Sequence, residues 1–182
     1  IDSPRLIKTR RFSEYQPRGT ETDVILDLMI HDIDIVLSLA SGSVSSVWAT
    51  GASVMTEHID IANAKIEFSD GLVAELQASR VSSEAIRESE IVADGRIFKI
   101  NYLTHEACVR HDSETDLDGE SSLPIFGDEQ KKVDVLYQEI LSFVVAVTNG
   151  TLPLVTGEDG KKALELAVEI SKRIKLSKNT LL

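Results

Sequence analysis

Hydrophobic and polar residues alternate with the period of a strand through the middle of the chain. Residues 44–80 contain three such runs, and two more flank the pair Asp94-Gly95. Successive side chains of a strand point to opposite faces, so this alternation predicts a sheet with one buried face. Asp70-Gly71 also lies between two runs, and Asp-Gly pairs in this position are typical of tight hairpins. Consecutive hairpins predict a largely antiparallel sheet.

Residues 23–40 have a different pattern, the period of a helix. A turn-rich loop precedes this segment, Thr22 or Asp23 can cap its start, and Ser41-Gly42 ends it. The remaining predicted elements are a first strand at residues 5–13, a strand near 104–112, an acidic loop at 112–122, and helices at 131–149 and 158–176. Helices gathered on one face of an antiparallel open sheet make an α+β fold.

The first helix carries one narrow polar line on an otherwise apolar surface. Asp27, His31, Asp34 and Ser38 are spaced i, i+4, i+7 and i+11, which places them within about 40° of one another around the helix. Asp32 is the one polar residue off this line. A helix that is apolar on most sides is buried on most sides, so the line faces solvent or a cleft.

Short carboxylates around one imidazole are suited to proton transfer. Asp27 and Asp34 lie about one turn before and after His31, and carboxylate neighbours favour the imidazolium form. A carboxylate bonded to one ring nitrogen leaves the other free to exchange a proton with a substrate. Two alternatives remain open at this point: a structural polar cluster, or a metal site built on the same three side chains.

Composition narrows the classes of function. The 182 residues suffice for one domain with a core, and the net charge of −11 disfavours nucleic acid as a partner. No apolar run reaches the ~18 residues that a membrane span needs. Cys108 is the single cysteine, which fits a reducing compartment and predicts a cytoplasmic protein. The chain begins with Ile1, so we expect a fragment of a longer or processed protein.

Motifs for nucleotide phosphates are missing from the chain, but arginines precede the polar helix. No glycine run matches G-x-G-x-x-G between a strand and a helix. Arg10, Arg11 and Arg18 lie just ahead of the helix, and a guanidinium fork suits a phosphate or a carboxylate. A solvated strand edge is the alternative interpretation of these arginines.

Three stretches resemble one family of oxidoreductases. VILDLMIHDIDIVLSL is similar to the D-x-x-x-H helix of the glucose-fructose oxidoreductase, inositol dehydrogenase and MocA-like (Gfo/Idh/MocA) family. IANAKIEFSDGLVAELQASR resembles its sheet strands with their F-x-D-G hairpin, and PLVTGEDGKKALELAVEISKRI its final loop and helix. The resemblance covers residues 5–176, with the three motifs in the family's order.

The resemblance implies a two-domain enzyme of which this chain is one part. An N-terminal Rossmann domain binds NAD or NADP in that family, and a C-terminal α+β domain contacts the substrate and mediates oligomers. Residues 1–182 resemble the second domain, so we expect the cofactor to be bound mainly by a domain absent from this chain. The family's lysine in an E-K-P motif is also absent, and the fragment alone is expected to be inactive.

The resemblance also assigns roles to residues. His31 corresponds to the acid/base on the substrate hydroxyl, and Asp27 is its catalytic partner. Arg10, Arg18 and Asp34 are expected to contact the substrate. The implied substrate is a sugar, a cyclitol or a nucleotide-sugar whose secondary hydroxyl is oxidised, with the redox chemistry supplied by the cofactor.

Two other functions remain open from the sequence. One is a non-catalytic assembly module in which the Asp/His line packs against a partner domain. The other is a metal-dependent hydrolase. Whatever the function, a sheet covered on one face leaves the other open, and we expect an apolar patch there that forms a homodimer or tetramer.

Overall fold

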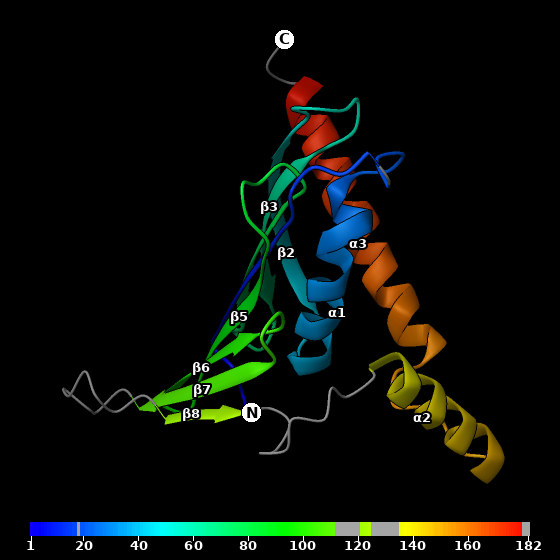
Figure 1. Ribbon diagram of the computed structural model, residues 1–182. Helices are drawn as coiled ribbons and strands as arrows, with labels where there is room; N and C mark the ends of the chain where they lie inside the picture. The colour runs from blue at the N-terminus through cyan, green and yellow to red at the C-terminus, as the bar shows by residue number, and fades with distance from the viewer. Residues whose placement is uncertain (18, 112–120, 125–134, 180–182) are drawn as a thin grey trace.

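The computed structural model describes residues 1–17, 19–111, 121–124 and 135–179. These residues form one open sheet of eight strands with helices beside it (Figure 1). The strands are β1 (Leu6–Phe12), β2 (Val44–Ala52), β3 (Ile61–Phe68), β4 (Val73–Ser79), β5 (Ile86–Ala93), β6 (Arg96–Asn101), β7 (Glu106–His111) and β8 (Ser121–Pro124). The helical elements are η1 (Ile25–Met29), α1 (Ile30–Leu39), α2 (Val135–Asn149) and α3 (Gly157–Asn179).

The first strand of the chain lies in the middle of the sheet. The strand order is β2-β3-β4-β1-β5-β6-β7-β8, and β1 pairs parallel with β4 and antiparallel with β5. The other neighbouring pairs among the described strands are antiparallel. β1 therefore joins two antiparallel units, β2–β4 and β5–β8, into one sheet.

Both predicted Asp-Gly hairpins are confirmed. Asp70-Gly71 connects β3 to β4, and Asp94-Gly95 connects β5 to β6. Gly71 has φ +88°, a conformation that costs a glycine little and an L side chain much more. The Asp70 carboxylate also accepts hydrogen bonds from the backbone N–H groups of Ser41 and Gly42, just past the end of α1. The hairpin therefore satisfies N–H groups at the end of the helix as well as reversing the chain.

One face of the sheet is covered by η1, α1 and α3, and the core lies between them (Figure 1). Its fully buried side chains come from all of these elements and include Ile7, Ile66, Leu76 and Ile91 from the sheet, Ile25, Met29, Ile33 and Val36 from η1 and α1, and Ile170 and Ile174 from α3. The predicted α+β class, a largely antiparallel open sheet with helices on one face, is confirmed.

The structure and the predicted elements differ in the C-terminal half of the chain. The strand β8 has no counterpart among the predicted elements, and α2 extends past the lower end of α3, away from the sheet (Figure 1). Residues 112–120 of the predicted acidic loop, and residues 131–134 of the predicted helix, lie outside the described residues.

A row of charged side chains crosses the middle of the open face. Cross-strand neighbours on that face alternate in charge across five strands, a row that we call the charge ladder. Its members are Lys65 on β3, Glu75 on β4, Lys8 on β1, Glu90 on β5 and Lys99 on β6. These central outward positions are charged because this face has no helix to bury them. Nearer the start of β1 the same face carries a partly exposed apolar row of Val73, Leu6, Val92 and Ile97. The expected apolar contact between copies therefore stays a prediction.

Candidate functional site

The segment predicted as one helix consists of two kinds of helix. Residues Ile25–Met29 form a π-helix, in which the N–H of Ile30 bonds to the carbonyl of Ile25, and a regular α-helix follows. Asp27 lies inside the π-helical part. π-Helical turns are rare and occur frequently at functional sites. This irregularity therefore draws attention to the same residue that the polar line does.

The polar line is present and faces outward. His31 and Ser38 are exposed, and Asp27 and Asp34 are partly exposed. The opposite stripe, formed by Ile25, Met29, Ile33 and Val36, has no exposed surface. The helix is therefore fixed by its apolar stripe and presents its polar line to the outside.

The structure brings Asp27 and His31 to one face but forms no bond between them. In the described part of the chain they share neither a hydrogen bond nor an ion pair. Asp34 lies farther along, in a groove between α1 and α3 that Lys162 and Leu154 also line. The predicted trio is thus spread along the helix, and Asp34 is better placed to face α3 than to act on the same atom as His31.

A buried ion pair fixes the helix to the central strand. Arg11 on β1 donates two hydrogen bonds to Asp32, with Nε–Oδ2 and Nη2–Oδ1 distances of 3.0 and 2.7 Å. The two side chains are 11% and 3% exposed. The Tyr102 ring lies 6.0 Å from the Arg11 guanidinium carbon, and its hydroxyl donates to Ser89. Burial raises the pKa of Asp32 even though Arg11 stabilises its carboxylate.

A second polar contact fixes the start of η1 to α3. Asp23 is buried and accepts hydrogen bonds from the Ile59 N–H and the Ser171 hydroxyl, and its carboxylate lies 2.8 Å from Lys175 Nζ. Burial alone would raise the pKa of Asp23, but Lys175 and the two hydrogen bonds outweigh it and lower the pKa. The prediction that the side chain of Thr22 or Asp23 caps the helix is wrong, since η1 has no side-chain cap.

Arg80 holds the loop that lies beside Asp27. The residue is 4% exposed, and its guanidinium donates to the carbonyl oxygens of Gly19 (2.9 Å), Thr22 and Ile59 (3.2 Å). Gly19 has φ +81°, and a Cβ atom built on it would lie 3.8 Å from a carboxylate oxygen of Asp27. The loop before η1 therefore forms one wall beside the Asp27 carboxylate, and Arg80 keeps it there.

Asp60 forms a buried ion pair with Arg80. Its carboxylate is fully buried, accepts hydrogen bonds from the backbone N–H groups of residues 54–56 and from the Thr56 hydroxyl, and lies 3.5 Å from Arg80 Nε. Burial opposes the charge, but these hydrogen bonds outweigh it and lower the pKa of Asp60 to about 2. The Asp60 carboxylate thus stays charged at neutral pH and links its own loop to Arg80.

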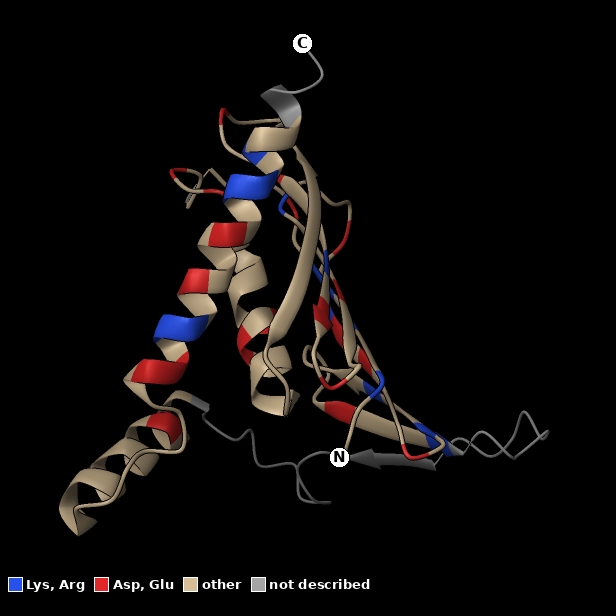
Figure 2. Cartoon of the chain, turned by 180° about the vertical axis from the view of Figure 1, so that it is seen from behind, with Lys and Arg blue, Asp and Glu red and all other residues tan. Residues whose placement is uncertain are grey.

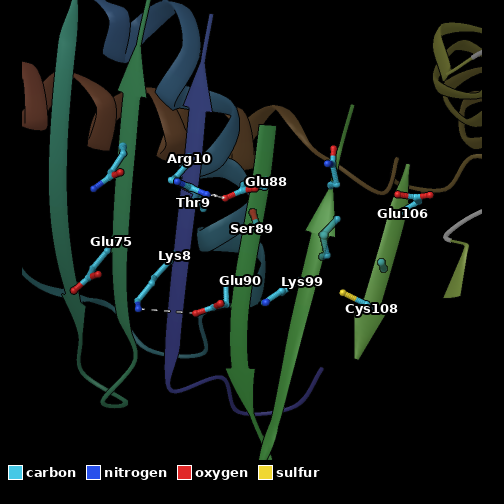
Figure 3. Close-up of a pocket in the computed structure, with 14 residues that line it drawn as sticks. Lys8, Thr9, Arg10, Glu75, Glu88, Ser89, Glu90, Lys99, Glu106 and Cys108 are labelled. Atoms are coloured by element: carbon cyan, nitrogen blue, oxygen red, sulfur yellow. Dashed lines mark hydrogen bonds and ion pairs between the residues drawn. The ribbon is translucent and has the colours of Figure 1, made fainter. Parts of the chain in front are cut away.

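The other predicted substrate contacts do not gather at His31. Arg10 points to the open face, where it is paired with Glu88 and lines a hollow with Lys8, Glu90 and Lys99 (Figure 3). The helix that carries His31 lies on the opposite face, so Arg10 and His31 do not line one site within this chain, and the substrate contact expected of Arg10 stays a prediction. Arg18 lies outside the described residues.

The described residues form neither a group of metal ligands nor a membrane-spanning helix. No three His, Cys, Asp or Glu side chains within this part of the chain are grouped so as to hold a metal ion. Asp27, His31 and Asp34 therefore do not form the metal site that the sequence left open. None of the helices in the same residues is long and apolar enough to cross a membrane.

Sequence reasoning missed Asp32 and Arg80 as parts of the site's support. In the sequence, Asp32 is the one polar residue off the line, and Arg11 is one of the arginines whose guanidinium suits a phosphate or a carboxylate. No sequence pattern relates two residues that are 21 positions apart to each other. Arg80 binds mainly backbone carbonyl oxygens, and because every residue type has one, the sequence does not reveal these partners.

Comparison with known proteins places the chain in a family. Residues 3–98 match the family model described as the GFO/IDH/MocA C-terminal domain. Over 168 residues the chain is 30% identical to a UDP-N-acetylglucosamine 3-dehydrogenase of Acidithiobacillus ferrooxidans, covering 92% of this chain and 54% of that protein. It is also 30% identical over 159 residues to a myo-inositol 2-dehydrogenase of Thermotoga maritima, covering 83% of this chain and 46% of that protein.

Solved structures show the same fold. The UDP-N-acetylglucosamine 3-dehydrogenase GnnA from Acidithiobacillus ferrooxidans superposes with a TM-score of 0.86 at 27% identity, over 97% of this chain and 55% of that one. A levoglucosan dehydrogenase in complex with NADH and levoglucosan has a TM-score of 0.81 at 15% identity, over 96% and 57%, a likeness of fold. This chain spans about half the length of the relatives it matches. It belongs to the GFO/IDH/MocA C-terminal domain family, as the three motifs predicted.

Proposed function

We propose that this chain is the substrate-binding half of an NAD(P)-dependent oxidoreductase that oxidises a secondary hydroxyl of a sugar, a cyclitol or a nucleotide-sugar. The observation that carries the proposal is the outward placement of His31 and Asp27 on a helix that is held by Arg11 and by the apolar core. A rigid helix that exposes an imidazole and a carboxylate one turn apart can orient a hydroxyl group for proton transfer. The dehydrogenase relatives support the class of reaction.

In the proposed reaction the substrate hydroxyl gives its proton to a ring nitrogen of His31. The carbon atom that bears this hydroxyl loses a hydride in the same step. Neutral imidazole is a suitable base near pH 7, because its ordinary pKa is close to 6.5. Asp27 binds a neighbouring hydroxyl of the substrate or, in the complex, the imidazole itself. The loop held by Arg80 closes the site beside Asp27 and limits how the substrate lies.

The nicotinamide, when bound, accepts the hydride. No G-x-G-x-x-G motif is present in the chain, so it has no glycine loop to cradle the cofactor's phosphates. We therefore assign the cofactor to a nucleotide-binding domain of the same polypeptide, together with the lysine that the family resemblance implies. A single cysteine and this cofactor fit a cytoplasmic enzyme.

UDP-N-acetylglucosamine is the first substrate to test, with oxidation at C3. A relative that aligns with 92% of this chain is a UDP-N-acetylglucosamine 3-dehydrogenase. The segment PRGTETDVILDLMIHDID is similar to enzymes of that activity. myo-Inositol is the second, from the other curated relative. A preference for the first would assign a nucleotide-sugar, and a preference for the second a free cyclitol.

The test is His31→Ala in the full-length gene product, with reduction of NAD or NADP followed by absorbance. Loss of a general base lowers kcat by about 10²- to 10⁴-fold, whereas Ser38→Ala, two turns along the same line, leaves kcat unchanged. Unchanged unfolding of both variants shows that the loss is chemical. Equal turnover for His31→Ala and the unmodified protein would favour the assembly module instead.

We also propose that two or four copies associate through the open face. The charge ladder is suited to a self-complementary contact, because rows of alternating sign can pair with the same row of a second copy. Such an interface is sensitive to ionic strength, so light scattering at low and high salt tests it. A monomer at micromolar concentration in low salt would contradict the proposal.

A further inference from the structure

Two arginines lie directly opposite each other on the covered face of the sheet. Arg87 on β5 is the register partner of Arg11 on β1. Ser89, Ile91 and Ala93 occupy every second position after Arg87 and are buried, so the alternation of the strand places Arg87 on the same face. Like charges directly opposite on neighbouring strands destabilise a sheet. Negative charge nearby would relieve this repulsion.

The protein supplies negative charge to one of the two arginines. Arg11 is bonded to Asp32 through Nε and Nη2, and its side chain is 11% exposed. Arg87 is exposed, and its guanidinium forms no ion pair or hydrogen bond with any residue that the structure describes. Asp32 carries one negative charge, whereas Arg11 and Arg87 together carry two positive charges. One positive charge is therefore left over at Arg87.

Arg87 differs from two other exposed arginines that the structure describes. Arg173 on α3 donates to Glu169 at 2.7 Å, and Figure 2 shows residues of both signs along that helix. Arg96 on β6 forms no ion pair with a described residue, but the residue opposite it is Ala93. Of these three, Arg87 alone combines an unpaired charge with a second arginine beside it, an arrangement that attracts anions.

Tyr102 fixes the backbone on the other side of Arg87. The Tyr102 N–H donates to the Arg87 carbonyl oxygen at 2.8 Å, and the Tyr102 hydroxyl donates to the Ser89 hydroxyl at 3.1 Å. The Tyr102 ring also lies 6.0 Å from the guanidinium carbon of Arg11. The backbone of Arg87 is thus held between β1 and Tyr102. A charge carried on a fixed backbone binds a ligand with a smaller loss of conformational entropy.

Arg87 also lies near the start of the helix that carries His31. Asp32 follows His31 in the chain, and burial raises the pKa of Asp32. The charges of Arg11, His31 and Arg87 each oppose that rise in pKa, so His31 and Arg87 act on the same carboxylate. Such effects are largely screened beyond about 10 Å in 0.1 M salt. Arg87 is therefore close enough to the proposed base to bind another part of the same substrate.

We propose that Arg87 binds a phosphate group of a nucleotide-sugar substrate while His31 acts on the sugar. This inference rests on the proposed function and selects the nucleotide-sugar among its substrates. A guanidinium forms two parallel hydrogen bonds with a phosphate group. Arg11, whose Nη1 is not engaged by Asp32, adds positive charge from the neighbouring strand. The diphosphate is joined to the sugar ring, so one substrate can reach both residues, whereas a free cyclitol offers Arg87 no anion.

The experiment measures the binding of UDP to the full-length gene product by calorimetry. The nicotinamide cofactor is present at saturation, so that its own phosphate site is filled. Arg87→Gln removes the charge, and Arg96→Gln is the matched control, an exposed arginine of the same hairpin. We expect Arg87→Gln to raise the Kd for UDP by about 10- to 100-fold, because it removes hydrogen bonds to a charged group. Arg96→Gln is expected to leave the Kd unchanged, and Arg87→Lys to give an intermediate value.

An unchanged Kd for Arg87→Gln, an equal loss for Arg96→Gln, or no binding of UDP at all would overturn the inference. A higher Kd for the cofactor in Arg87→Gln, with UDP binding intact, would assign the phosphate to the cofactor and overturn it too. Arg87→Ala repeats the measurement if Arg87→Gln does not fold. UDP binding that depends on Arg87, without reduction of NAD or NADP, would contradict the proposed function alone. Turnover of myo-inositol without UDP binding would contradict only this inference.

Discussion

The two faces of the sheet carry ion pairs in opposite surroundings, and neighbouring residues of β1 supply both. Arg11 turns to the covered face and is bonded to Asp32 with both side chains buried. Arg10 turns to the open face, where its bond to Glu88 is exposed to solvent. The alternation of a strand separates the two arginines, although one peptide bond joins them.

Burial decides what each pair contributes. Exposed pairs contribute about 0–1 kcal/mol, because water and salt screen them. Loss of one partner from a buried pair costs about 3–5 kcal/mol, because the other charge is left uncompensated. On the covered face an ion pair fixes the position of the helix that carries His31. The ion pairs of the open face can instead contribute to the association of copies that we propose.

The largest effect is expected for Asp32→Ala. The substitution leaves the Arg11 guanidinium buried without its partner, so the free energy of unfolding falls by about 3–5 kcal/mol. Asp34→Ala, two residues along the same helix and partly exposed, is the control and changes it by less than about 0.5 kcal/mol. Chemical denaturation measures both. Similar losses for the two variants would show that the covered pair has no special weight.

A smaller, pH-dependent loss is expected for Asp60→Asn. The pKa of Asp60 is about 2 in the folded protein against an ordinary 3.8, so the carboxylate contributes about 2 kcal/mol to stability above about pH 5. A lowered folded pKa means that this contribution is lost as pH falls from about 5 toward 2. The variant should therefore approach the unmodified protein in stability in acid.

Denaturation at several pH values measures this convergence. Glu84→Gln removes an exposed carboxylate as the control and is expected to change stability by less than about 0.5 kcal/mol. A stability difference for Asp60→Asn that stays constant from neutral pH into acid would contradict the assignment of the charge to Asp60.

The smallest effect is expected for Glu88→Gln on the open face. Loss of the exposed pair with Arg10 lowers the free energy of unfolding by at most about 1 kcal/mol, and high salt reduces the difference further. Denaturation at low and high salt measures it. The loss for Asp32→Ala should change little with salt, and equal salt dependence of the two variants would remove the distinction between the faces.

Local features of the fold follow from the sequence, and long-range ones do not. Asp70-Gly71 and Asp94-Gly95 form the hairpins they predict because a short turn depends on its own residues. The place of β1 between β4 and β5 depends on pairing of Leu6 with residues 67 and 86 positions later, which alternation does not specify. The spacing of apolar residues likewise does not predict the π-helical turn at Asp27.

The site divides in the same way. The helical period predicted that Asp27 and His31 share a face, and they do. The sequence left the arginines before the helix as anion ligands or as part of a solvated strand edge, and the face that each one occupies depends on the register of β1. Arg11 therefore binds an aspartate of its own chain, and Arg10 points away from the helix. For this geometric reason Arg10 and His31 do not meet within the chain.

The central place of β1 has a consequence for biosynthesis. Residues 6–12 leave the ribosome well before their partners, residues 73–79 and 86–92. At the usual speed of translation of about 5–20 residues per second, the strand waits roughly 4–15 s for both neighbours. During that interval Ile7 and Thr9, both fully enclosed in the finished protein, have no native cover. The nascent chain is therefore most open to chaperones, and to association with other nascent chains, before its first hairpins have been made.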